Sequence, residues 1–216
     1  MHPIRAAMRS LRAGGFTLVE AMIALAIMAI MLAVGIPRMS DWLAATKANA
    51  AGGFYAEGFT LARAQALSNN SASRLVLGRN TVSGQYDWQV DVCFPTQDAP
   101  CSETSGSWST ASAAVKAAQD TGAGVKSVVR SAESLPGTSR LSVTPGPDGD
   151  TAVYFTPLGW VDTRIATRMM RIDLAPASGA GAANGFRPSS VVLTLAGVAA
   201  RCEPNAALND SRRCPE

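Results

Sequence analysis

The chain has 216 residues, of which 47% are hydrophobic and 16% are charged, and this composition excludes a disordered protein. Its 19 basic and 16 acidic side chains give a formal charge of +3, and its single histidine is His2. One histidine at the extreme N-terminus leaves little room for catalysis or metal binding by histidine side chains.

The N-terminus is a short basic segment followed by a long apolar one. Residues 1–15 contain three arginines and no acid, whereas residues 21–37 carry no charge. Counted from Phe16, the apolar run has 22 residues, and about 20 are enough to span a bilayer. Because the basic residues precede the run, we expect a cytoplasmic start and an outward crossing. A cleaved secretory signal is the alternative, but its cleavage site would have to fall around residues 34–37.

Glu20 is the one ionisable side chain within the apolar run. A carboxylate near the membrane core costs about 2.5–3.5 kcal/mol, so such groups are rare and usually functional. Glu20 could lie one turn inside the interface and extend its carboxylate to water. It could instead meet a cation, and a free amine on Phe16, made by cleavage after Gly15, would supply one. A neighbouring subunit, shifted along the helix axis, could bring its own amine to Glu20.

The run Gly15-Phe16-Thr17-Leu18-Val19-Glu20, after a basic leader, resembles the type III signal of the type IV pilin superfamily. This resemblance implies that prepilin peptidase cuts after Gly15 and methylates Phe16. It also implies that Glu20, fifth in the mature chain, serves assembly. Pro37 matches a proline commonly found near the end of the membrane segment in that family.

A helical pattern continues beyond Pro37 to the pair Asn69-Asn70, which offers a stop. Residues 16–69 would form a helix roughly 80 Å long, with soft points at Pro37 and at Gly52-Gly53. One stripe at near-helical spacing is expected to pack on a β-sheet. It comprises Leu43, Ala50, Phe54, Leu61 and Ala64.

After Asn70 the pattern changes to short runs of strand-forming residues separated by glycine and proline. The sequence therefore predicts an α+β fold, with a long N-terminal helix packed on a C-terminal antiparallel β domain. The expected organisation is a leader at 1–15, a transmembrane assembly helix at 16–37, an amphipathic helix at 38–69 and a periplasmic β domain at 70–216. Expected strands cover 74–77, 86–92, 125–130, 140–143, 151–155, 169–174 and 190–195.

Two later patterns, at residues 60–66 and 154–159, are similar to the GspH/FimT branch of the superfamily. That resemblance implies a minor pilin in the tip or initiation complex of a type IV pilus, anchored first in the bacterial inner membrane. The implied partners are other pilins or pseudopilins and prepilin peptidase. The H pseudopilin of a type II secretion system is the alternative. The sequence offers no nucleophile–base pair, so we expect no enzymatic activity.

The four cysteines all follow the membrane segment, on the side where thiols tend to oxidise. Four cysteines allow three pairings, and we favour the pairs nearest in sequence, which enclose proline-bearing loops. Zinc ligation by four thiolates is the alternative, but the spacings do not resemble those of zinc knuckles. We expect no metal and no cofactor. The favoured bridges are Cys93–Cys101 and Cys202–Cys214.

Charge gives limited support to nucleic-acid binding. Cleavage after Gly15 would leave sixteen basic and sixteen acidic side chains, which is not the broad basic surface of a DNA-binding protein. Pilins of this branch that take up DNA are associated with a C-terminal Gly-Arg-x-Arg motif, and residues 197–201 here lack its first arginine. A local patch is still an alternative, because a Cys202–Cys214 bridge would draw together Arg201, Arg212 and Arg213.

Overall fold

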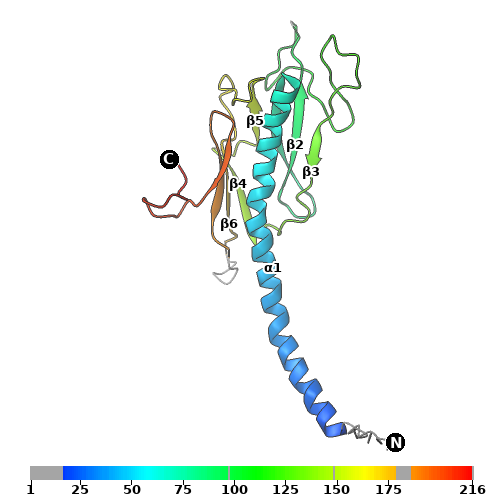
Figure 1. Cartoon of the computed structure of the whole chain (residues 1–216), viewed down its shortest axis with the longest axis vertical. Coiled ribbons are helices and arrows are strands. Elements are labelled where there is room, and N and C mark those ends of the chain that lie inside the picture. Colours follow the sequence, from blue (N-terminus) through cyan, green and yellow to red (C-terminus); the bar gives the residue numbers. More distant parts are fainter. Residues whose placement is uncertain (1–16, 97, 148, 179–185, 216) are drawn as a thin grey trace, which may run out of the picture. The chain divides into compact units, whose positions relative to one another are not determined.

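The computed structural model describes residues 17–96, 98–147, 149–178 and 186–215 (Figure 1). It contains a helix, α1 (Leu18–Asn69), followed by eight strands. The chain divides into two units, one ending at Ser40 and the other running from Asp41 to the C-terminus. Helix α1 contributes to both units.

The ends of α1 are set by local hydrogen bonds. The Glu20 amide donates to Thr17 Oγ1 at 3.2 Å, which satisfies one of the amides that has no partner within the helix. At the other end Asn70 adopts a left-handed φ of 46°. The Asn70 amide then donates to Leu67 O and the Ser71 amide to Ala66 O, which closes the last turn. The predicted stop at Asn69-Asn70 is therefore confirmed.

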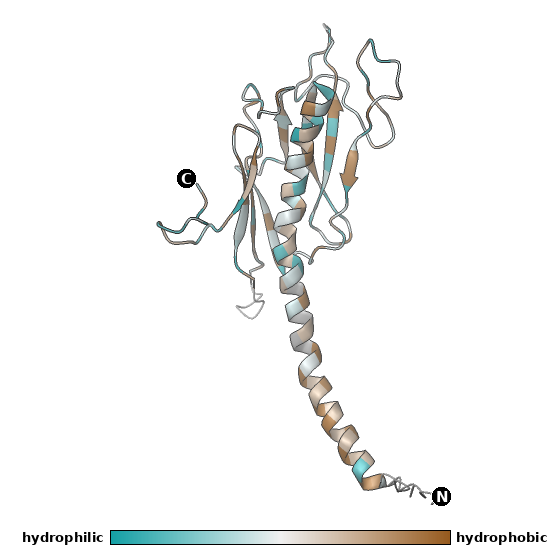
Figure 2. Ribbon diagram, in the orientation of Figure 1, coloured by the Kyte–Doolittle hydropathy of each residue, from teal (hydrophilic) through white to brown (hydrophobic). Residues whose placement is uncertain are grey.

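The N-terminal part of α1 is apolar on its surface (Figure 2). Residues Leu18–Ile36 form a segment of 19 residues with a mean hydropathy of 2.5, and none of it is buried. By length and composition this segment could cross a membrane. The helix continues through Pro37.

Two antiparallel sheets follow the helix, where the sequence analysis expected one. The first has the strand order β3-β2-β1-β5 and the second β4-β6-β7-β8. Each of the seven predicted strands has a counterpart, and the eighth strand was missed. The strands are β1 (Ala72–Arg79), β2 (Tyr86–Cys93), β3 (Val128–Arg130), β4 (Leu141–Gly146), β5 (Ala152–Phe155), β6 (Arg171–Pro176), β7 (Ser189–Leu193) and β8 (Ala199–Cys202).

The second half of α1 packs on these sheets with a different face from the one predicted. Leu43 is 49% exposed, Ala50 and Ala64 are exposed, and Phe54 and Leu61 are only half-buried. The prediction was wrong because both faces of this alanine-rich helix carry aromatic and small side chains, so their spacing alone does not show which face packs on the sheets. Gly58, for example, lies so near β1 and β2 that a Cβ there would be 3.1 Å from Leu75 Cδ1. The buried face consists of Ala48, Ala51, Tyr55, Phe59, Ala62 and Ala66.

Hydrogen bonds fix the helix against the first sheet. Trp88 Nε1 donates to Phe54 O at 2.9 Å, and Tyr55 Oη donates to Tyr86 O at 3.1 Å. Ser73 Oγ donates to Ala62 O at 2.6 Å. Because buried polar groups are costly without partners, these bonds favour one register of helix on sheet.

Candidate functional site

The first candidate site is the start of α1, which carries Glu20 in its first turn. The carboxylate lies among exposed large apolar side chains such as Leu18 and Met22, and the described residues offer it no ion pair. Gly15 and Phe16, the predicted cleavage and methylation positions, lie outside the described residues. Pro37 lies within α1. A carboxylate on an apolar helix without a local cation is suited to pairing with a group from another chain.

Both favoured disulfides are present. The Cys93–Cys101 bridge has a Cα–Cα distance of 6.0 Å, and the Cys202–Cys214 bridge has one of 4.8 Å. No cysteine is free, so the thiolates that zinc would need are used in disulfides. Within the described residues no group of three or more histidine, cysteine or acidic side chains could hold a metal ion.

The predicted arginines differ in their surroundings. The Arg201 guanidinium crosses to α1, where it donates to Asn49 O at 3.1 Å and lies so close to Gly52 that a Cβ there would be 2.8 Å from Arg201 Nε. The Arg213 amide donates to Asp210 O, in the loop that the second disulfide closes. Gly52 is therefore the point where an arginine packs on the helix.

Arg212 forms two ion pairs in the C-terminal loop. Its guanidinium contacts Asp210 at 2.8 Å and Glu203 at 3.0 Å. Hydrogen bonds from the Arg212 side chain, and a further one from its amide, lower the pKa of Asp210 from 3.8 to about 2. The same ion pair raises the pKa of Arg212. The charge of Arg212 is thus compensated locally.

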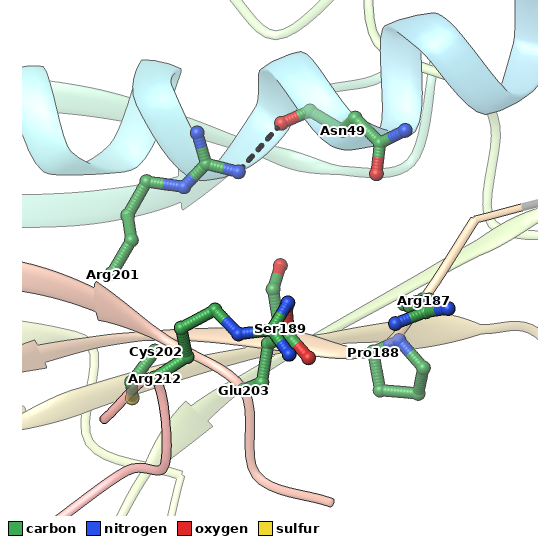
Figure 3. A pocket seen from close by; sticks show the side chains of 8 residues that line it. All are labelled: Asn49, Arg187, Pro188, Ser189, Arg201, Cys202, Glu203 and Arg212. Carbon is green, nitrogen blue, oxygen red and sulfur yellow. Dashed lines mark hydrogen bonds and ion pairs between the residues drawn. The ribbon is translucent and has the colours of Figure 1, made fainter. Parts of the chain in front are cut away.

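A groove brings two of the predicted arginines together with a third that sequence reasoning missed. The groove encloses about 500 Å³ between α1 and the β7–β8 side of the second sheet (Figure 3). Arg187 stands just before β7, fourteen positions before Arg201 in the sequence, and no motif there marks it. The antiparallel pairing of β7 with β8, in which Arg201 lies opposite Val191, brings the segment that contains Arg187 to the same groove as Arg201. The lining residues are Asn49, Arg187, Pro188, Ser189, Arg201, Cys202, Glu203 and Arg212.

Comparison with known proteins identifies the N-terminal segment. Residues 11–36 match the family model of the prokaryotic N-terminal methylation motif. No curated protein and no solved structure matches the chain. The matched segment includes Gly15, Phe16 and Glu20 and the whole apolar segment Leu18–Ile36 of α1.

These findings support a class of protein. The methylation motif at residues 11–36 supports a type IV pilin-like protein, of a pilus or a pseudopilus, and the exposed apolar segment and the antiparallel β domain are compatible with that class. The motif implies assembly with other pilins and processing by prepilin peptidase. The apolar segment is compatible with membrane anchoring before assembly.

Proposed function

We propose that this chain is a minor pilin of the GspH/FimT type, which enters the tip or initiation complex of a type IV pilus. The observation that carries the proposal is the methylation motif on the apolar segment Leu18–Ile36 of α1, none of which is buried. The branch is inferred from the resemblance of residues 60–66 and 154–159, and these two segments are in contact, since Arg63 Nε donates to Gly159 O at 3.3 Å. The chain then acts as a structural subunit rather than an enzyme.

The mechanism rests on Glu20. Before assembly, the helix is held in the inner membrane with the β domain in the periplasm. Cleavage after Gly15 frees the amine of Phe16, which is cationic at neutral pH. Four residues of helix correspond to about 6 Å, so a neighbour offset by about that distance along the axis brings its amine level with Glu20. The pair removes the cost of two isolated charges in an apolar surrounding, and the pairing sets the axial register.

Substitution of Glu20 tests the proposal in cells that assemble pili. Glu20→Gln removes the charge at nearly constant size, and Glu20→Asp keeps the charge. We expect both variants to reach the membrane at the normal level. Glu20→Gln should be depleted about tenfold or more from sheared filaments, because an uncompensated amine replaces an ion pair. Glu20→Asp should retain part of the incorporation.

The matched control is Glu57→Gln, since Glu57 is an exposed acid on the second half of α1. This variant should enter filaments normally. Incorporation of Glu20→Gln at the level of Glu57→Gln would refute the pairing mechanism.

The H pseudopilin of a type II secretion system would use the same helix chemistry in another machine. Deletion of the gene separates the two functions. Loss of surface pili with normal secretion of exported proteins supports the minor pilin, whereas the reverse result supports the pseudopilin. The length of the chain and its two disulfides favour the pilus.

A DNA-binding minor pilin is less well supported. Arg212 is compensated by two carboxylates, and Arg201 donates to the helix. These acids would repel a phosphate backbone that followed the loop. Binding of duplex DNA is therefore an outcome of the experiment described next, rather than part of the proposal.

A further inference from the structure

The groove between α1 and the β7–β8 side holds more positive than negative charge. Three arginines line it, against the single carboxylate of Glu203 (Figure 3). Arg212 uses its guanidinium on Glu203 and on Asp210, which lies just outside the lining residues. Arg212, Glu203 and Asp210 together carry one positive and two negative charges. The other positive charges at the groove belong to Arg187 and Arg201.

Arg187 and Arg201 keep donors available. Arg187 is exposed, and its side chain forms no hydrogen bond or ion pair with the described residues. The described part of the chain gives the Arg201 side chain one hydrogen bond, to Asn49 O. A guanidinium carries five N–H donors, so both side chains could receive an acceptor from outside. Carboxylate oxygens match the guanidinium fork best among protein groups.

The walls of the groove are held in place on both sides. The Cys202–Cys214 disulfide ties the end of β8 to the C-terminal loop. On the opposite wall Arg201 is bonded to the helix. Ser189 and Asn49 add a hydroxyl and an amide to the lining. A site with fixed walls loses less conformational entropy when a ligand binds than a mobile surface would.

We propose that this groove binds a carboxylate-bearing segment of a neighbouring pilin-type subunit, with Arg187 and Arg201 as the groups that receive the carboxylate. This inference rests on the proposed function, because it takes the partner to be another subunit. A peptide carboxylate requires only one or two guanidinium groups in a confined groove. Duplex DNA requires a run of phosphate contacts, and the mature side chains sum to no net charge.

The test uses the full-length chain in detergent and a fluorescent oligoglutamate peptide as the probe. Anisotropy at low salt should show binding that weakens as salt rises to about 0.2 M. An oligoglutamine peptide of the same length should not bind. Arg187→Gln and Arg201→Gln should each weaken oligoglutamate binding about tenfold. Arg187→Gln is the more informative variant, because Arg187 makes no described contact that the fold needs.

Arg140→Gln is the matched control. It removes the same charge from an exposed arginine that does not line the groove, and it should bind the probe like the wild type. Absence of oligoglutamate binding at low salt, or equal binding by the Arg187, Arg201 and Arg140 variants, would overturn the proposal. Tighter binding of duplex DNA than of oligoglutamate, lost in the Arg187 and Arg201 variants, would also overturn it and assign the groove to nucleic acid.

The result can be separated from the proposed function. The anisotropy assay does not depend on cleavage or on filaments, whereas the Glu20 variants report on filament incorporation alone. If Glu20→Gln is depleted from filaments as expected but oligoglutamate does not bind, the groove proposal is rejected and the minor pilin proposal stands. If Glu20→Gln enters filaments normally and oligoglutamate binding depends on Arg187 and Arg201, the pairing mechanism of Glu20 is rejected and the groove proposal stands.

Discussion

Among the described glycines, Gly197 leaves the least room for a side chain. It has a φ of 77° in the turn between β7 and β8, and a Cβ there would overlap Gly159 O. Only glycine fits, because a side chain would be both in a left-handed conformation and in contact with backbone. The turn after β5 and the turn after β7 meet at this point, beside Arg63 of α1.

Gly197→Ala should therefore lower the free energy of unfolding by at least about 2 kcal/mol, of which the left-handed backbone accounts for about 1–2 kcal/mol. Urea denaturation of the full chain in detergent, followed by tryptophan fluorescence, measures the change. Gly53→Ala is the control, since nothing lies within 4 Å of its Cβ position and alanine favours the helix by about 0.5–1 kcal/mol. If Gly197→Ala proved as stable as Gly53→Ala, the two turns could not be in the contact described.

Asp210 offers a titration that reports directly on the C-terminal loop. Hydrogen bonds from Arg212 lower its pKa from 3.8 to about 2 in the folded chain. A depressed pKa means that the pair stabilises the fold above the ordinary pKa, and that this contribution is lost as pH falls from about 4 to about 2. Carboxyl NMR should give a midpoint near 2, and Arg212→Gln should return it toward 3.8. A wild-type midpoint near 3.8 would show that the ion pair does not persist in solution.

At the scale of the elements, helix α1 gives the clearest test of the packing. Phe59 is fully buried, whereas Leu61, which belongs to the predicted stripe, is half-buried. Phe59→Ala should cost about 3–5 kcal/mol of stability because it leaves a cavity in the core. Leu61→Ala should cost about 1 kcal/mol. Chemical denaturation of the two variants measures the difference, and a larger loss for Leu61→Ala would favour the stripe predicted from sequence.

The elements that could be predicted were those with strong local signals. The alternating and β-branched residues of β1 and β2 mark strands, and Asn69-Asn70 marks the end of α1. Strand β8 reads Ala-Ala-Arg-Cys, which has little strand propensity, so its conformation depends on pairing with β7. The division into two sheets depends on pairings between distant segments, which local patterns do not encode.

In the candidate sites too, features with local sequence signals were predictable, and features that depend on contacts between distant segments were not. The methylation motif was predictable because Gly15, Phe16 and Glu20 stand at fixed spacing before an apolar run. The disulfides followed from sequence proximity. The groove was not predictable, because Arg187 and Asn49 reach it only through the β7–β8 pairing and the packing of α1. The buried face of α1, which includes Tyr55 and Phe59, was missed because the opposite stripe has a similar mixture of alanine and large apolar side chains.

At the scale of the whole molecule, the two units differ in how far their apolar side chains are buried. The unit from Asp41 onward has a core cluster that includes residues of α1 and of both sheets, together with two disulfides. In the N-terminal unit, none of the residues that the structure describes belongs to that core cluster, and none of the apolar segment Leu18–Ile36 is buried. Exposed apolar surface of this extent requires a membrane or other helices. The exposed segment is therefore compatible with membrane anchoring before assembly, and we propose that Glu20 sets the axial register once a neighbouring subunit pairs with it.

The central claim is tested most directly by the intact mass and the N-terminal sequence of the protein recovered from sheared filaments. The account predicts a chain that begins at Phe16, carries one methyl group on its amine and retains both disulfides. Such a terminus would supply the cation that Glu20 requires. Recovery of an assembled chain that still begins at Met1 would contradict the account, because no free amine would then lie at the start of the apolar helix.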